Sequence, residues 1–301
     1  MSKILVTGGA GFIGKHLCER LLEKDHKVKC LDNFYRFEEE KISDLKSEED
    51  FELVEADIRD KEKIEPHFND VDHVVHLAAQ SDVVGSLENK DFSFETNVEG
   101  TWNVLRCSEE NDVDRFVFAS SREVYGDTDG KIAEKQDFDP KNYYGASKVS
   151  GELYLDQFEE YSELETYALR LANVYGPGDK DRVIPIFLER ALKGEKLELY
   201  GGDQVLDFVW IEDVVEAFTS ILENGFEDRK VNLGSGKGTS VEELAYKIKE
   251  VTDSNSEIVE EEERGFDTKA FISKNGLMEQ LVDEITDLET GLKKMLESER
   301  A

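Results

Sequence analysis

The fold of this chain is decided by one stretch near its N-terminus, Thr7-Gly-Gly-Ala-Gly-Phe-Ile-Gly14. The apolar, β-branched run 3–7 leads into it and predicts a buried strand, and apolar residues at helical spacing follow to about residue 25. In such a turn Gly8 permits the bend, Gly11 leaves space for a phosphate at the backbone, and Gly14 lets the helix pack on the strand. Because the helix N-terminus also offers N–H groups and a positive dipole end, the stretch predicts a site for dinucleotide phosphates.

A carboxylate stands at the end of the next predicted strand, residues 27–32. Asp32 lies 18 residues after Gly14, where an acid can hold the 2′-hydroxyl of an adenosine ribose. An acid there repels a 2′-phosphate, so we predict NAD as the cofactor, while Arg36 keeps NADP open as an alternative. An ordinary glycine-rich turn is disfavoured, because the strand, the helix and Asp32 occur together in the required order.

The 301-residue chain is strongly acidic, with 70 Asp and Glu residues against 37 Lys and Arg residues and a net charge of −33. This charge repels nucleic-acid phosphates, so we expect no nucleic-acid partner. Two interpretations of the acidity stay open: a saline cytoplasm, in which salt screens the repulsion, or a basic partner. The acidic residues are spread along the chain as on a solvated surface, and we favour the saline cytoplasm.

No stretch is long and apolar enough to span a membrane, and the N-terminus does not read as a signal peptide, so we expect a cytosolic protein. The three cysteines, Cys18, Cys30 and Cys107, lie within apolar patterns and are interpreted as small buried hydrophobic residues. No Cys/His cluster has the spacing of a zinc site, and we predict no bound metal.

Strands and helices alternate through the first half of the chain. The later predicted strands cover residues 51–57, 71–78, 115–120 and 165–172, and the helices cover about 60–69, 91–111 and 143–161. This alternation is typical of a parallel sheet covered on both faces, with ligands at the carboxyl ends of its strands. We therefore predict an α/β fold with a Rossmann-type, doubly wound parallel sheet.

The alternation loosens after Gly178. Shorter elements follow, with helices predicted near 211–224, 239–253 and 279–297. We predict a dinucleotide-binding domain at residues 1–173, onto which the segment 205–233 packs back, and a smaller C-terminal α/β substrate lobe at residues 174–301.

An acid–base pair is predicted at Tyr144 and Lys148, which are four residues apart on one face of a predicted helix. A nearby ammonium favours phenolate over phenol, which makes the tyrosine a useful general base. Ser121, at the end of the strand that precedes this helix, can hydrogen-bond a substrate hydroxyl. The alternative is a surface Tyr and Lys without a role, and the phosphate loop together with Ser121 disfavours it.

Further motifs run along almost the whole chain: HLAAQ at 76–80, TNVEGT at 96–101, SSREVYG at 120–126, YGASK at 144–148, LRLANVYGPG at 169–178 and DFVWIEDV at 207–214. With TGGAGFIG at 7–14, they make the chain resemble an extended short-chain dehydrogenase/reductase of the NAD-dependent nucleotide-sugar epimerase/dehydratase family, of the UDP-glucose 4-epimerase type. The resemblance implies a Rossmann domain for NAD, a smaller lobe for a nucleoside-diphosphate sugar, and a homodimer formed through the helices 91–111 and 143–161.

The resemblance also implies roles for individual residues. The cofactor-binding set is Gly8, Gly11, Phe12, Ile13, Gly14, Asp32, Asn33, Asp57, Ile58, Leu77, Ala78, Ala79, Asn97, Ser120, Tyr144 and Lys148. The substrate-binding set is Gln80, Ser81, Arg122, Asn173, Arg182 and Arg264, and the catalytic set is Ser121, Tyr144, Lys148 and Glu123. Structural alternatives remain for three positions: Asn97 as a backbone bridge, His76 as a packing residue, and Arg264 as a surface residue.

Two positions depart from the family pattern. Leu206 stands where the family has an arginine that meets the diphosphate, so another cation must replace it: Arg182, Lys237 or Arg264. Glu123 matches the base of the dehydratases, but Arg122 stands where the glucose-type dehydratases have an acid, and an arginine cannot donate that proton. Glu123 can equally pair with Arg122 or accept from a sugar hydroxyl.

Three functions follow from this comparison. We favour a nucleotide-sugar 4-epimerase that acts through a transient 4-keto sugar. The alternative is a 4,6-dehydratase or a UDP-glucuronate decarboxylase that uses Glu123. A non-catalytic NAD-binding protein is disfavoured, because it would be expected to lose Tyr144 or Lys148.

Overall fold

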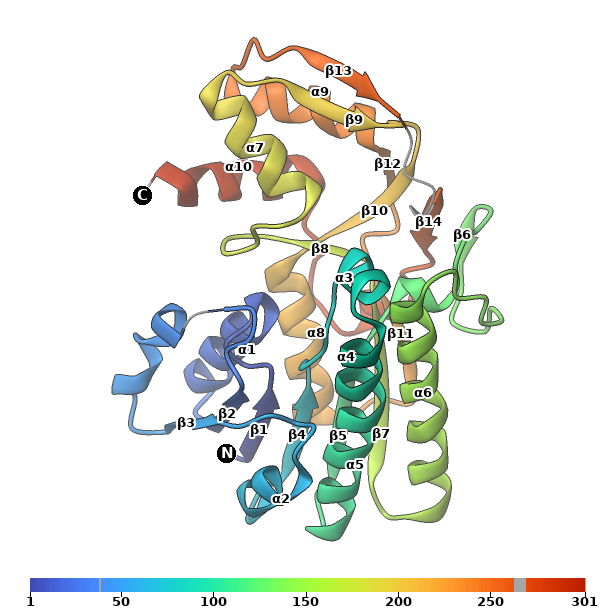
Figure 1. Ribbon diagram of the computed structural model, residues 1–301. Helices are drawn as coiled ribbons and strands as arrows, with labels where there is room; N and C mark the ends of the chain where they lie inside the picture. The colour runs from blue at the N-terminus through green and yellow to red at the C-terminus, as the bar shows by residue number, and fades with distance from the viewer. Residues whose placement is uncertain (38, 263–268, 301) are drawn as a thin grey trace. The chain divides into compact units, whose positions relative to one another are not determined.

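The computed structural model describes residues 1–37, 39–262 and 269–300. The chain forms two compact units (Figure 1). Unit 1 comprises Met1–Gly126, Phe138–Arg170 and Val215–Val231, and unit 2 comprises Asp127–Asp137, Leu171–Val214 and Asn232–Ala301.

The sheet of unit 1 has seven strands, in the order β11-β7-β5-β4-β1-β2-β3. Its pairs from β5 to β3 are parallel. Consecutive residues of the central strands are buried, so side chains on both faces of the sheet are covered. The predicted Rossmann-type sheet is confirmed. The strands are β1 (Lys3–Thr7), β2 (Lys27–Asp32), β3 (Phe51–Glu55), β4 (His73–His76), β5 (Arg115–Ser121), β7 (Glu165–Leu171) and β11 (Lys230–Leu233).

The helices between these strands follow the sequence prediction, apart from the segment before β5 and the helix predicted over 60–69, which ends at Ile64 and continues as a 3-10 helix over Glu65–Phe68. They are α1 (Phe12–Glu23), α2 (Lys61–Ile64), α3 (Val83–Glu88), α4 (Lys90–Phe94), α5 (Thr101–Glu110), α6 (Tyr143–Tyr161) and α8 (Ile211–Asn224). The prediction of α6 is confirmed to the residue at both ends. Asn142 caps its N-terminus by accepting a hydrogen bond from the Gly145 N–H, which explains where the helix begins.

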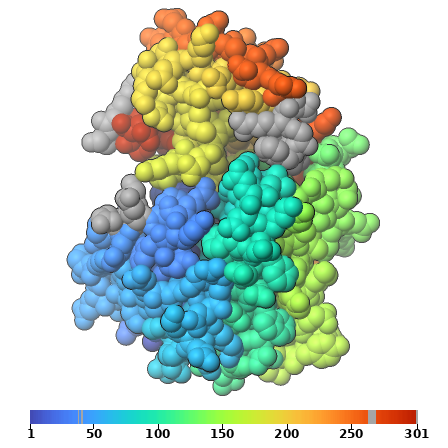
Figure 2. Space-filling model, viewed as in Figure 1, coloured from blue at the N-terminus to red at the C-terminus, as the bar shows by residue number. Residues whose placement is uncertain are grey.

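The single helix predicted over 91–111 is wrong in detail. Asn89 ends α3 and caps α4, because its side chain accepts from the Phe92 N–H. A π-helix then runs over Glu95–Gly100, before α5. Such π segments are rare and often occur at functional sites. Figure 2 shows this part of the chain, in teal, on the surface of unit 1 beside α6, in yellow-green.

Unit 2 contains a five-stranded sheet, with β12-β10-β14-β6 in order and β8 paired to β10, and a two-stranded sheet of β9 and β13. The strands are β6 (Lys131–Ile132), β8 (Asn173–Tyr175), β9 (Leu197–Tyr200), β10 (Val205–Trp210), β12 (Gly238–Ser240), β13 (Ile258–Glu261) and β14 (Ala270–Ser273). The helices are α7 (Val183–Lys193), α9 (Val241–Thr252) and α10 (Leu288–Arg300).

The helix predicted from residue 279 begins later, at Leu288. Met278–Gln280 forms only a short 3-10 helix, and Asp287 caps α10 by accepting from the Thr290 N–H. Gly291 lets α10 approach Tyr175 closely, since a Cβ at that position would lie 2.0 Å from the tyrosine hydroxyl.

The core of unit 1 is apolar and includes Phe68, Val104, Phe116 and Phe118, which have no exposed surface. Burial of each such side chain stabilises the fold by about 1.5–3 kcal/mol. The three cysteines are free and buried, as predicted. Among the described residues, no helix is long and apolar enough to cross a membrane.

Candidate active site

The glycine turn between β1 and α1 is closely packed. Gly8 has a φ of +71°, and a Cβ there would lie 2.6 Å from the backbone nitrogen of Ala78. A Cβ on Gly14 would lie 2.3 Å from the Gly8 carbonyl oxygen. Gly11 is different, because the nearest atoms to a Cβ there would be that oxygen, at 3.2 Å, and the Phe37 ring, at 3.8 Å. Sterics within the fold therefore require Gly8 and Gly14, whereas a Cβ at Gly11 needs a shift of only a few tenths of an ångström in the Gly8 carbonyl.

The N-terminus of α1 fits a phosphate. Gly11 occupies the N-cap position, and no side chain caps the helix there. The first turn of a helix presents N–H groups that have no partner within the helix, together with the positive end of the dipole. Gly11 has no side chain to cover the first-turn N–H groups of α1, so a dinucleotide phosphate can reach them.

Asp32 ends β2 beside this turn. Its two carboxylate oxygens accept from the backbone N–H groups of Ala10, at 3.0 Å, and Phe34, at 2.9 Å. Burial raises the pKa of Asp32, and these backbone bonds oppose the rise. Each oxygen of an ionised carboxylate keeps a further acceptor position, so Asp32 can also accept from a ribose hydroxyl.

Two other predicted cofactor residues lie close to each other. The Asn33 side chain donates to the Asp57 carboxylate at 3.0 Å, and Arg59 forms an ion pair with the same group at 2.8 Å. Partial burial works to raise the pKa of Asp57, but Arg59 and Asn33 outweigh it and lower the pKa to about 2. Asp57 is therefore ionised throughout the physiological range.

Asn97 lies in the π-helix and links three segments. Its oxygen accepts from the Gln80 N–H at 2.8 Å, and its amide donates to the Gln80 carbonyl and to the Ser147 hydroxyl. The side chain thus joins the loop after β4 to α6, which is the bridging alternative considered from the sequence. The other residues predicted in this loop, Leu77, Ala78, Ala79 and Ser81, follow β4 directly.

The predicted acid–base pair lies at the start of α6. Tyr144 is 9% exposed and Lys148 is 3% exposed. The Lys148 ammonium donates to the Ala119 carbonyl at 2.7 Å and lies 5.8 Å from the centre of the Tyr144 ring. Burial lowers the pKa of Lys148 to about 7, against the opposing charge of Glu152. A cation is thus held close to the tyrosine that it would activate.

His76 is buried at the end of β4, near Lys148. Its ring nitrogens contact the hydroxyl oxygens of Thr7, at 2.6 Å, and Thr101, at 2.9 Å. Burial, and then the Lys148 charge, lower the pKa of His76 to about 3, so the ring is neutral. Both nitrogens are used within the protein, which agrees with the packing role proposed from the sequence.

Ser120 and Ser121 end β5. The Ser121 hydroxyl accepts from the Glu123 N–H at 3.2 Å and caps the short 3-10 helix Arg122–Val124. The cap uses only the oxygen as an acceptor, so the Ser121 hydroxyl can still donate to a substrate.

Glu123 is held by two neighbours. Arg122 forms an ion pair with one carboxylate oxygen at 3.0 Å, and the Asn142 amide donates to the other at 2.8 Å. The carboxylate is buried. The ion-pair alternative considered from the sequence is therefore the arrangement in the structure.

The predicted substrate residues of unit 2 are engaged locally. The Asn173 amide donates to the Asp207 carbonyl, and Arg182 forms an ion pair with Asp179. Leu206 lies in β10 between Thr239 of β12 and Phe271 of β14. Arg264 lies outside the described residues.

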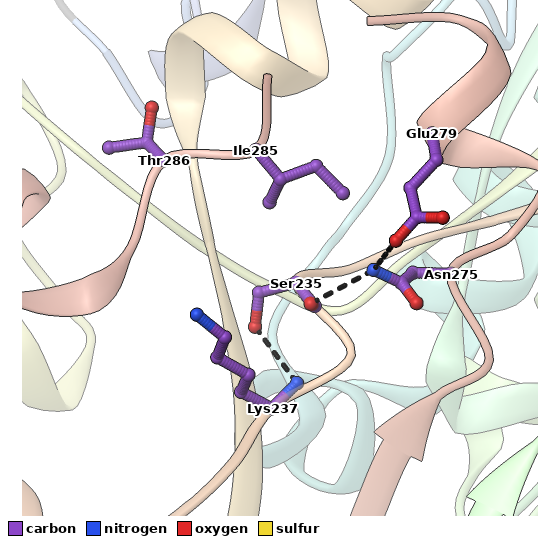
Figure 3. A pocket seen from close by; sticks show the side chains of 6 residues that line it. All are labelled: Ser235, Lys237, Asn275, Glu279, Ile285 and Thr286. Carbon is purple, nitrogen blue, oxygen red and sulfur yellow. Dashed lines mark hydrogen bonds between the residues drawn. The ribbon is translucent and has the colours of Figure 1, made fainter.

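Lys237 is the other cation that we considered in place of the missing arginine. It lines a cavity of about 260 Å³ in unit 2, together with Ser235, Asn275, Glu279, Ile285 and Thr286 (Figure 3). Glu279 accepts from the Asn275 amide there, so the cavity carries a carboxylate as well as an ammonium. This mixed lining is less suited to a diphosphate than a purely cationic one.

Sequence reasoning assigned no role to three polar residues around the acid–base pair: Asn142, which is half-buried, and Glu152 and Arg170, which are buried. Asn142 had a local signal, because an asparagine directly before a predicted helix is a frequent N-cap. Glu152 lies four residues after Lys148 and so shares its helix face. The pairing of Glu152 with Arg170 on β7 had no signal in the spacing.

Comparisons with known proteins agree with this geometry. A model of the NAD dependent epimerase/dehydratase family matches residues 4–234. A protein of Methanocaldococcus jannaschii, provisionally named as a UDP-glucose 4-epimerase, is 39% identical over 254 residues, which cover 82% of this chain and 81% of that protein. A UDP-N-acetyl-α-D-glucosaminuronate decarboxylase of Bacillus cytotoxicus is 34% identical over 271 residues, with 85% and 82% covered.

A solved structure is also similar over nearly the full length. The UDP-glucose 4-epimerase of Thermotoga maritima, determined with UDP-glucose, superposes with a TM-score of 0.92 at 34% identity. The similarity covers 99% of this chain and 98% of that one.

Proposed function

Because the chain belongs to the NAD-dependent epimerase/dehydratase family, we propose that it is a nucleotide-sugar 4-epimerase of the UDP-glucose/UDP-galactose type. The observation that favours epimerisation is the state of Glu123, whose two carboxylate oxygens are held by Arg122 and Asn142. Each oxygen keeps a further acceptor position, but the neighbour that pairs with Glu123 is Arg122, which cannot donate the proton that a leaving 6-hydroxyl needs in a dehydratase.

NAD is the cofactor of this family, and when bound it supplies the acceptor and donor of the hydride at C4 of the sugar. Tyr144, as the phenolate, removes the proton of the C4 hydroxyl and later returns it. Lys148 stabilises the phenolate by its positive charge. Ser121 donates a hydrogen bond to the oxygen on C4 of the sugar. This bond holds the transient 4-keto sugar while the sugar turns its other face toward the cofactor.

We assign the phosphates of the cofactor to the turn of Gly8, Gly11 and Gly14 with the backbone of Phe12 and Ile13. Asp32 holds the ribose, and the loop after β4 lines the rest of the cofactor site. The sugar nucleotide is bound by residues 174–301 with Asn173, and Arg182 and Arg264 are our candidates for the cations that meet its diphosphate.

The second candidate is a decarboxylase or 4,6-dehydratase that shares the same first oxidation. The similarity to a glucosaminuronate decarboxylase favours keeping it. In that reaction Arg122, released from Glu123, would be free to meet a sugar carboxylate or hydroxyl. The two candidates differ in the mass of their products, which makes them separable.

The deciding experiment uses a panel of UDP-, dTDP- and GDP-sugars incubated with the protein and NAD. Mass spectrometry and proton NMR of the products should show an unchanged mass and an inverted C4 signal for at least one sugar. Loss of water, or of carbon dioxide from a uronate, would replace our proposal with the second candidate.

Replacement of Glu123 by glutamine tests the role of this carboxylate. For a positioning role we expect turnover to fall less than about tenfold, since one charge-assisted hydrogen bond is worth about 1.5–3 kcal/mol and is only partly lost. A general base would lose about 10²–10⁴-fold. Glu160→Gln, an exposed change of the same charge on α6, is the matched control.

We also propose a homodimer formed through α6 together with the helical segment 91–111 beside it. Their surface carries a group of exposed apolar residues: Phe94, Trp102, Leu153, Tyr154 and Tyr161. The rings of Trp102 and Tyr154 lie 5.1 Å apart, so the group is continuous between α5 and α6. We expect light scattering to give the mass of two chains, and Leu153→Glu to give one. Leu192→Glu, at an exposed leucine of α7, is the control that should remain dimeric.

The charge of −33 leads us to propose a cytoplasmic protein of an organism with a saline cytoplasm. The three free cysteines suit a reducing compartment. Because salt screens repulsion between surface carboxylates, we expect the melting temperature to rise in molar KCl. A flat or falling curve would favour the basic partner instead.

A further inference from the structure

A second set of buried charges lies one helical turn beyond the acid–base pair. Glu152 on α6 has no exposed surface, and Arg170 on β7 is 1% exposed. The guanidinium grips the carboxylate at two points, with Nη2 at 2.6 Å from Oε2 and Nε at 2.9 Å from Oε1. No step of the proposed reaction uses either residue.

This pair is tied to the end of β5. The Ser120 hydroxyl donates to Glu152, while the carbonyl of the preceding residue, Ala119, accepts from Lys148. The following residue is Ser121. In β5, Ala119 thus contacts the Lys148 ammonium and Ser120 contacts the Glu152 carboxylate. Ser121, the next residue, lies at the proposed substrate site.

Arg170 is fixed from its other side by aromatic groups. It donates to the Tyr125 hydroxyl at 2.6 Å, and its guanidinium lies about 5 Å from the ring centres of Tyr125 and Phe138. Its position therefore does not depend on Glu152 alone. A buried ion pair is often no more stabilising than an apolar pair of the same size, so stability alone does not account for it.

The charges around Lys148 are few. On its own helix it faces Tyr144 and Glu152, and from β4 it faces His76, which is neutral. From β5 it faces the ring of Phe118, at 4.5 Å. Arg170 on β7 is the other charge of the cluster. Glu152 is therefore the negative charge that supports a buried ammonium at this place.

We propose that Glu152, clamped by Arg170 and Ser120, is a positioning residue for the acid–base pair: its carboxylate is the counter-charge that keeps Lys148 protonated beside Tyr144. The proposal rests on the proposed function, in which the Lys148 ammonium stabilises the Tyr144 phenolate. Glu152 and Arg170 thus act on the reaction indirectly, through the charge of Lys148.

The test compares the pH dependence of turnover for the wild-type protein and Glu152→Gln. Loss of the carboxylate lets burial lower the pKa of Lys148 further, so the alkaline limb of the profile should move down by about one pH unit or more. A merely structural role would lower the whole profile and leave the limb in place, which would overturn the proposal. Glu152→Asp, which keeps the charge, should restore the limb, and Glu160→Gln should not move it.

A second readout needs no substrate and stays informative if the sugar panel gives no product. Lys148 binds its proton less tightly in the folded chain than in the unfolded chain, so the free energy of unfolding should rise with pH between about 7 and about 10.4. The difference from Lys148→Met isolates this slope. In Glu152→Gln the slope should begin at lower pH, and an unchanged onset would contradict the proposal.

Glu152→Gln removes the carboxylate that balances the buried charge of Arg170, and a variant that fails to fold gives no profile. The double variant Glu152→Gln with Arg170→Gln removes both charges, so no guanidinium is buried without a carboxylate. Its alkaline limb and its stability slope should shift in the same direction as those of the single variant. If the alkaline limb and the onset of the stability slope both lie at the same pH in the double variant as in the wild-type protein, the proposal is overturned.

Discussion

Replacement of Tyr144 by phenylalanine is expected to reduce turnover about 10³-fold while NAD stays bound. The change removes one hydroxyl from a side chain that is otherwise buried, so the fold should be retained. General acid–base groups contribute about 10²–10⁴-fold to rate, and no other described residue combines a hydroxyl with a buried ammonium on the same helix face.

The measurement is turnover of the accepted sugar, with bound NAD quantified after denaturation of the protein. The matched control is Tyr143→Phe, at the neighbouring tyrosine, which is half exposed and lies near Lys90. This control should keep wild-type turnover. Near-normal activity of Tyr144→Phe would show that another group moves the proton.

Much of the fold could be predicted from local patterns. The first strand, its glycine turn and α1 have a strand run, three glycines and a helical period in uninterrupted order. The bounds of α6 are also local, because Asn142 provides the cap and apolar spacing carries the helix. Elements of this kind need no knowledge of distant partners.

The segment of 83–110 could not be predicted in the same way. Its apolar period is compatible with one long helix, and the division depends on the Asn89 side chain and on the π-helix. The π-helix places Asn97 against Gln80 and Ser147, which are distant in sequence. A tertiary contact thus overrides the local pattern, as it commonly does at functional sites.

The residues of the site also differ in whether local spacing or a distant partner determines their role. Tyr144 and Lys148 were identified because helix geometry fixes their spacing. The role of Glu152 depends on Arg170, which comes from β7, and the role of Glu123 depends on Asn142, which is 19 positions away, so neither follows from local spacing. Spacing along the chain predicts which residues share a face, but not which charge a buried carboxylate will find.

Replacement of Gly11 by alanine is expected to weaken NAD binding about 100-fold, or about 3 kcal/mol, without unfolding the protein. Gly11 has a φ of −73° and a ψ of 175°, which alanine adopts freely. The nearest atoms to a Cβ there would be the Gly8 carbonyl oxygen, at 3.2 Å, and the Phe37 ring, at 3.8 Å. The methyl group would instead stand where we place the cofactor phosphates, in front of the first-turn N–H groups of α1.

The neighbouring glycine separates this effect from a folding defect. In Gly14→Ala the Cβ would lie 2.3 Å from the Gly8 carbonyl and 2.6 Å from the Gly9 Cα, so that variant should lose stability itself. Gly276→Ala, where a Cβ meets nothing within 4 Å, should change neither property. Calorimetric titration with NAD and thermal melting of the three variants give the two properties independently. Wild-type affinity in a folded Gly11→Ala protein would mean that the phosphates do not approach this turn, because within the fold the methyl group requires only a small shift of the Gly8 carbonyl.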